Sequence, residues 1–165
     1  MRISNKIFSA ILCATVLLAA CNKEKGLGPN YRGYTSPAIP VTVTNQVDNR
    51  PDPTVTTSLS GSGAIQIVLA IPSTSGRTIK EITKVAISTS YVQIQASGTS
   101  GFYTTTPIAG SGTSVTFNTS ITEYKSKKTE TVTANTELTQ RFYFLVTLDD
   151  GSVLIPTPVR VLVLP

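Results

Sequence analysis

The chain has 165 residues, of which 40 % are hydrophobic and 14 % charged; its net charge is +5, and it contains neither His nor Trp. This balance excludes a highly charged disordered tail, a coiled coil and a disulfide-rich miniprotein, and the length fits one domain. Without His, the usual proton shuttle at neutral pH and the commonest metal ligand are both missing.

The first twenty residues are typical of an export signal. Arg2 and Lys6 form a short positive stretch, and residues 7–20 then run without a charge. Such a run is too short to span a membrane comfortably but suits the core of a signal peptide. It ends in Leu18-Ala19-Ala20-Cys21, which resembles the lipobox of bacterial lipoproteins. An ordinary apolar run with a chance Cys, or a plain secretory signal, is the alternative.

In that family the Cys thiol receives a diacylglyceryl group, a peptidase cuts just before it, and the new amino group is acylated. The resemblance therefore implies that residues 1–20 are removed and that lipid on Cys21 binds the protein to a membrane. The next residue is Asn22 and not Asp, which in the enterobacterial sorting scheme favours the outer membrane. Lys23-Glu24 faintly resembles the export tag of surface-exposed lipoproteins, so the periplasmic face and the cell surface both remain open.

Cleavage before Cys21 changes the cysteine and charge counts. Cys13 leaves with the signal and Cys21 becomes a thioether, so the remaining 145 residues cannot form an internal disulfide. Loss of Arg2 and Lys6 leaves 12 basic against 9 acidic residues. This net charge of +3 is too small and too scattered to indicate a nucleic-acid partner.

Residues 21–35 are polar and broken by Gly and Pro, which predicts a flexible tether. Residues 36–165 form the predicted domain, and its apolar residues alternate with a period of two, as in half-buried strands. Ser and Gly clusters separate these runs, a spacing typical of a sandwich or barrel. The expected strands include residues 39–43, 65–71, 115–121 and 142–148.

One segment is ambiguous. Ile79, Ile82 and Ala86 have the spacing of a short amphipathic helix, whereas Val85 and Ile87 alternate as in a strand. Because the neighbouring residues are β-branched, we expect a strand.

The C-terminal part predicts a hairpin. Residues 139–148 read as a strand, Asp149-Asp150-Gly151-Ser152 as a tight turn, and residues 153–164 as the returning strand. Pro156 and Pro158 cannot donate to a ladder, so the returning strand must lie at an edge or bulge there.

This arrangement of residues 138–164 resembles the last two strands of fibronectin type III and related immunoglobulin-like domains, with Tyr143 as the nearest match to their corner tyrosine. The resemblance implies an all-β fold, an immunoglobulin-like antiparallel β-sandwich of about seven to nine strands. It implies no function, because this fold has many unrelated roles.

No pattern of catalytic residues stands out. The many Ser and Thr hydroxyls lack a partner base, and the adjacent Asp149 and Asp150 would point apart as strand neighbours. Residues 48–52 concentrate oxygen donors, which suits a turn better than a calcium site because alternating ligands are missing. The sequence therefore predicts a protein that is not an enzyme and has no cofactor or metal.

The remaining classes of function are a binding role and a structural role. Tyr103 and Tyr124 lie in or next to predicted loops and are the candidate ligand contacts, since exposed aromatic rings stack on sugars and anchor interfaces; the alternative is that they cover the edges of the core. Lys125, Lys127 and Lys128 form a basic cluster, read as a solvated loop or a contact for anionic headgroups or glycans.

We expect a lipid-anchored, non-catalytic binding or structural module, with a glycan or an envelope protein as partner. The alternatives are an accessory glycan-binding lipoprotein of an outer-membrane uptake system and a surface-filament or adhesin subunit.

Overall fold

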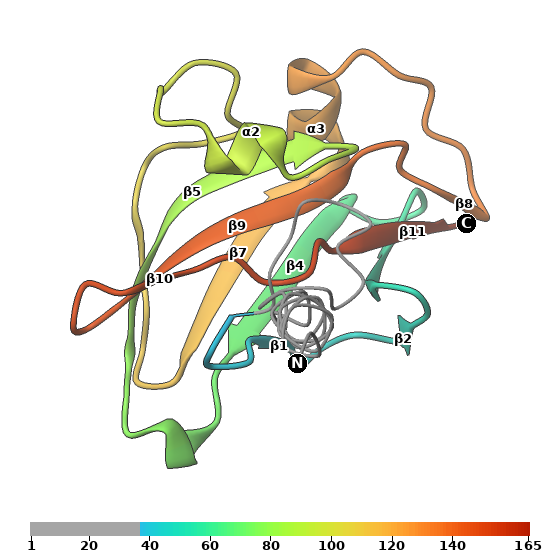
Figure 1. The fold of residues 1–165 in the computed structure, drawn as a ribbon. Coiled ribbons are helices and arrows are strands. Elements are labelled where there is room, and N and C mark those ends of the chain that lie inside the picture. The colour runs from blue at the N-terminus through green and yellow to red at the C-terminus, as the bar shows by residue number, and fades with distance from the viewer. Residues whose placement is uncertain (1–36) are drawn as a thin grey trace, which may run out of the picture. The chain divides into compact units, whose positions relative to one another are not determined.

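A computed structural model describes residues 37–165. The expectations for the signal, for Cys21 and for the tether fall outside these residues. Within residues 37–165 the chain forms eleven strands in three sheets and three short helical segments (Figure 1).

Two antiparallel sheets pack face to face. The first has the order β1-β4-β7, and the second has the order β10-β9-β5-β6. The strands of the first sheet are β1 (Thr42–Val43), β4 (Ala64–Ala70) and β7 (Ser114–Ser120). Those of the second are β10 (Val153–Leu154), β9 (Arg141–Leu148), β5 (Ile79–Ser88) and β6 (Ile108–Ala109).

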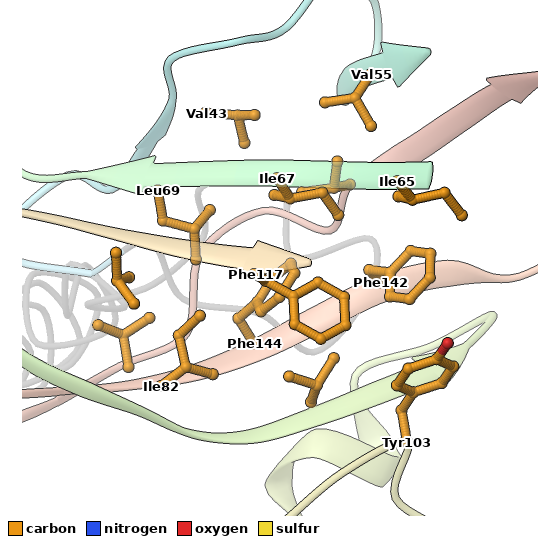
Figure 2. Packing of buried hydrophobic residues seen from close by; sticks show 14 of the residues in the cluster. Val43, Val55, Ile65, Ile67, Leu69, Ile82, Tyr103, Phe117, Phe142 and Phe144 are labelled. Carbon is orange, nitrogen blue, oxygen red and sulfur yellow. The ribbon is translucent and has the colours of Figure 1, made fainter. Parts of the chain in front are cut away.

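The core lies between these sheets, as Figure 2 shows. Alternate residues of β4 point inward from the first sheet, and Phe142 and Phe144 on β9 point inward from the second. The Phe117 ring on β7 lies 5.6 Å from that of Phe142 and 5.5 Å from that of Phe144. Such offset and edge-to-face contacts add to the free energy gained by burying the rings.

A third sheet has the order β2-β3-β11-β8 and shares the same core through Val55, Val161 and Val163. Its strands are β2 (Asp48–Asn49), β3 (Pro53–Ser58), β11 (Arg160–Leu164) and β8 (Thr136–Glu137). The β3–β11 pair is parallel, whereas the sequence predicted antiparallel pairing throughout. The reason is that the N-terminal part of the chain pairs first with β4 and then crosses to run beside the last strand.

The all-β sandwich is confirmed, with eleven strands where about seven to nine were expected. Strands β1, β4 and β7 correspond to strands A, B and E of such domains, and β5 and β9 correspond to C and F. The predicted hairpin is present, with Gly151 at φ +83° in the turn between β9 and β10. The prolines act as expected, because β10 is an edge strand that ends before Pro156, and β11 belongs to another sheet.

The ambiguous segment is a strand, β5. Its pairing with β9 shifts register between Ile79 and Glu81 and again between Ile82 and Lys84. Each irregularity inserts a residue, so Ile79, Ile82 and Val85 are all buried although they are three residues apart.

Two helices and a 3₁₀ turn were not predicted: η1 (Ser73–Ser75), α2 (Val92–Gln95) and α3 (Ile121–Lys127). The expected strand 115–121 was wrong at its end, because Ile121 begins α3. The Ser120 hydroxyl accepts a hydrogen bond from the Glu123 backbone N–H at 3.1 Å and caps the helix. The expected strand at 39–43 is also shorter, since only Thr42 and Val43 belong to the ladder.

The second face of β9 is buried as well. Tyr143 points away from Phe142 and Phe144 and is fully buried in a smaller cluster with Tyr91, Ile94 and Ala86. The Tyr91 and Tyr143 rings meet edge to face at 5.0 Å. Helix α2 and its flanking loop therefore form a partial outer layer on the second sheet.

Candidate functional site

Both candidate contact tyrosines lie in the core, so the structure agrees with the alternative that they cover the core and not with exposed ligand contacts. Tyr103 is 2 % exposed and Tyr124 is 0 % exposed. Their rings pack against Phe142, at 5.4 Å and 5.9 Å between centroids. Neither face is open for a sugar to stack on. Tyr124 is buried because α3 turns it inward, and Tyr103 is buried because it packs against the Phe117 and Phe142 rings.

The phenol groups of these residues fix α3 in place. The Tyr103 hydroxyl is hydrogen-bonded to the Thr119 hydroxyl, which donates to the Glu123 carboxylate at 2.8 Å. The Tyr124 hydroxyl donates to the Glu130 carboxylate at 3.0 Å and accepts from the Gln140 N–H. Burial raises the pKa of Tyr103 and that of Tyr124 to about 12. These groups are therefore neutral structural donors.

The basic cluster lies on α3, where a loop was expected. Lys125 and Lys127 occupy its last turn and Lys128 is its C-cap, and all three are exposed. Positive side chains are favourable there because they face the negative end of the helix dipole. Within the described residues none of them forms an ion pair, and the Lys127 ammonium lies 5.8 Å from the Tyr103 ring centroid.

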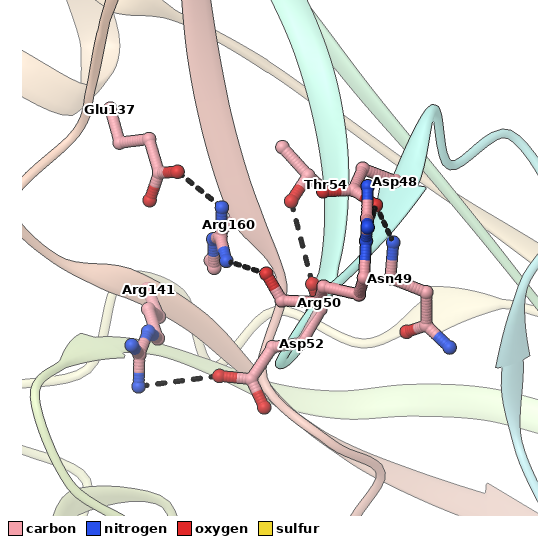
Figure 3. Close-up of polar contacts among 8 residues, drawn as sticks. All are labelled: Asp48, Asn49, Arg50, Asp52, Thr54, Glu137, Arg141 and Arg160. Carbon is pink, nitrogen blue, oxygen red and sulfur yellow. Dashed lines mark hydrogen bonds and ion pairs between the residues drawn. The ribbon is translucent and has the colours of Figure 1, made fainter.

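The segment 48–52 consists of β2 and the bend that leads from it into β3, and its carboxylates are held by arginines (Figure 3). Asp48 accepts from the Asn49 N–H and pairs with Arg50 at 3.2 Å, contacts that lower the pKa of its carboxyl. The buried Asp52 carboxylate pairs with Arg141 at 3.3 Å. Arg160 donates to the Arg50 carbonyl at 2.6 Å and also binds Glu137. The carboxylates of Asp48 and Asp52 thus bind arginines of the same chain, and the expected turn is confined to residues 50–52.

Asp149 and Asp150 also serve a turn. Arg77 binds both carboxylates, at 3.0 Å and 2.6 Å. Asp149 accepts from the Thr78 N–H, a hydrogen bond that lowers the pKa of this carboxyl. Asp150 accepts from the N–H of Ser152. The two carboxylates therefore clamp the β9–β10 turn to the start of β5.

No catalytic arrangement emerges from residues 37–165. No three His, Cys, Asp or Glu side chains in that range gather as a metal site requires. Among the same residues, no helix has the length and apolar character needed to cross a membrane. Every arginine in this part of the chain is in an ion pair with a carboxylate.

The sandwich has two distinct ends. At one, which we name the β1 end, Thr42 and Ser114 both pair with Ala70, and turns 71–78, 110–113 and 149–152 lie together. At the other, the helix end, Ser120 pairs with Ala64 and Ser88 with Arg141. Helices α2 and α3 lie at this end, at the top of Figure 1. The described chain thus begins at the β1 end, and the exposed lysines lie at the opposite one.

Comparison with known proteins leaves the family open. No family model, curated protein or solved structure matches the chain.

Proposed function

We propose that the protein is a lipid-anchored β-sandwich of the bacterial cell envelope, held on the outer membrane through Cys21, which acts as a non-catalytic binding or structural module. The observation that carries the proposal is the sequence pattern of residues 1–21, with its positive start, uncharged run and Leu18-Ala19-Ala20-Cys21 ending.

The arrangement of the domain is compatible with this anchor. Residues 21–35 precede the described chain, which reaches the sandwich at the β1 end. Fully extended, such a tether spans at most about 50 Å. We expect the partner to meet the opposite, helix end, where α2 and α3 lie and Lys125, Lys127 and Lys128 are exposed.

The partners of the carboxylates support a non-catalytic binding or structural role more than an enzymatic one. The carboxylates of Asp48, Asp52, Glu137, Asp149 and Asp150 bind arginines of the same chain. The carboxylates of Glu123 and Glu130 accept hydrogen bonds from hydroxyl groups of the same chain. A general base must be free to reach a substrate proton, and these groups have structural partners instead.

The choice of partner class follows from the tyrosines. Exposed aromatic rings were one of the two supports for the glycan-binding alternative, beside the lysine cluster, and Tyr103 and Tyr124 are buried. Another envelope protein is therefore the partner class that we favour.

The anchor is tested by expressing the full chain in a Gram-negative host. The wild-type protein should partition into detergent and carry acyl mass on Cys21, because two or three acyl chains hold a protein firmly. Cys21→Ala should remain unprocessed and unlipidated. Cys13→Ala is the matched control, since it removes the other thiol of the signal region and should be processed normally. Wild-type protein that is found lipid-free in the medium would contradict the proposal.

A further inference from the structure

The edges of the three sheets differ greatly in length. Three sheets have six edge strands among the described residues, and five of these are only two residues long. The exception is β7, which has seven residues and lies at one edge of the first sheet.

The short edges are also protected in ways that β7 is not. Asp48 and Glu137 place charges on β2 and β8, Pro107 directly precedes β6, and Pro156 follows β10. Strand β7 has no charged residue and no Pro, and all its residues pair with β4 without a register shift. Natural proteins protect long edges with charge, Pro or bulges because an open edge pairs with other strands. At its start the outer edge is occupied, since Ser114 exchanges backbone hydrogen bonds with Ser111 of the preceding turn. The unprotected edge after Ser114 therefore indicates a partner strand.

The fold leaves room for such a strand. In immunoglobulin constant-type domains the corresponding sheet has the order A-B-E-D, so a fourth strand covers strand E. Here residues 110–113 lead directly from β6 to β7, and no strand within residues 37–165 takes the fourth position. In the same range, residues 115–119 make no backbone hydrogen bond to any segment besides β4.

We propose that β7 is the contact between two copies of this chain, which pair their β7 strands antiparallel across a two-fold axis. The sequence of β7, Ser-Val-Thr-Phe-Asn-Thr-Ser, is uncharged throughout, with small or β-branched residues on both sides of Phe117 and Asn118 as the exception. With Phe117 on the axis, Thr116 faces Asn118 of the second copy and Val115 faces Thr119 of the second copy. A two-fold interface requires this self-complementarity, and the two three-stranded sheets become one sheet of six strands.

The side chains of β7 favour this pairing. Phe117 already points into its own core, so the new contact requires no repacking there. On the outer face, Thr116 is half-buried and Asn118 is exposed, where it accepts from the Gln66 amide at 3.1 Å. Like charges directly opposite each other destabilise a strand pair, and this interface contains no charges at all.

The expected strength is modest. Edge pairing adds backbone hydrogen bonds but buries little apolar surface, so the dimer should form only at high concentration in free solution. Two copies held on one membrane experience an effective concentration of about 1 mM, which compensates for weak pairing. The pairing itself does not depend on the anchor, so the failure of either proposal leaves the other standing.

A charge exchange on the outer face tests the interface. The full chain, in detergent micelles at about 1 mM, is examined by sedimentation equilibrium. Thr116→Lys/Asn118→Lys places lysines opposite lysines and should weaken the dimer about tenfold. Thr116→Lys/Asn118→Glu places opposite charges across the axis and should restore it. An unchanged β-type circular dichroism spectrum shows that both variants fold. A wild-type monomer, open-ended aggregates, or equal weakening by both variants would overturn the proposal.

Disulfide trapping tests the register. In a full chain with Cys13→Ser and Cys21→Ser, single variants Thr116→Cys and Asn118→Cys are oxidised separately and as a mixture. Opposite residues have their Cβ atoms close enough for a disulfide, so the mixture should cross-link several-fold more than either variant alone. Thr42→Cys, on the other edge of the same sheet, is the matched control. Cross-linking of Thr42→Cys to the same extent would show that the thiols meet by random collision and would overturn the assignment.

Discussion

Truncating the side chains of β9 one at a time measures how much each face of this strand contributes to stability. Phe144 is fully buried, and its ring lies edge to face with Phe117. Phe144→Ala removes the ring from a packed core between two sheets, so we expect it to lower the free energy of unfolding by about 3–5 kcal/mol.

The opposite face provides the sharper comparison. Tyr143 is also fully buried, against Tyr91 and Ile94 near α2. Tyr143→Ala should therefore cost about the same as Phe144→Ala. Thr147 lies on the same face as Tyr143, is half-buried and shares a 2.6 Å hydrogen bond with the Thr83 hydroxyl. Thr147→Ala should cost only about 0.5–1.5 kcal/mol.

Urea unfolding of the wild type and the three variants measures these free energies, and an unchanged m-value shows that the unfolding reaction is the same. If Tyr143→Ala costs no more than Thr147→Ala, then α2 does not cover the second sheet. If Phe144→Ala costs under about 1 kcal/mol, the core assignment itself is wrong.

Two further predictions concern a close approach and the buried phenols. A Cβ at Gly110 would lie 2.8 Å from the carbonyl carbon of Ile79, so Gly110→Ala should lower the urea midpoint of unfolding strongly. Gly98→Ala is the control, because a Cβ there meets open space and should leave the midpoint unchanged. Equal midpoints for the two variants would refute the contact. Because burial raises the pKa of Tyr103 and Tyr124 to about 12, the folded protein holds more protons than the unfolded chain between about pH 10 and 12, and stability should fall as the pH rises through this range. Tyrosinate absorbance checks this, and titration of all tyrosines together near pH 10 in the folded protein would contradict it.

The main strands were predictable because burial on one face imposes a period of two. In β4, Ile65, Ile67 and Leu69 are buried and the residues between them are not, so sequence and structure agree. In β9 the same reasoning identified Phe142 and Phe144 but missed the burial of Tyr143. That burial depends on α2, and a four-residue helix has no periodicity to detect.

The ambiguity over β5 has a physical cause. Its two register shifts change the face to which the following residues belong, so the buried Ile79, Ile82 and Val85 repeat every three residues. This spacing imitates a helix, and only pairing with β9, far away in the sequence, explains it.

The burial of the two candidate contact tyrosines has a related cause. Tyr124 was placed in or next to a loop, but it lies on α3 with its ring inward. A local signal for this helix was present, since Ser120 and Glu123 have the Ser-x-x-Glu spacing of a capping box. The burial of Tyr103, by contrast, depends on the distant Phe142 and Phe117 rings and has no local signal.

The parallel pairing of β3 with β11 determines how the domain carries mechanical load. Thr54 to Ser58 run beside Arg160 to Leu164 in the same direction over five residue pairs. A force that pulls the N-terminal side of β3 and the C-terminal side of β11 apart loads these hydrogen bonds together in shear, whereas only two residue pairs hold β1 on β4. In single-molecule pulling we expect β1 to detach at low force and the β3–β11 pair to set the main rupture force. A protein anchored at one end and bound at the other would thereby resist tension after its first strand has yielded.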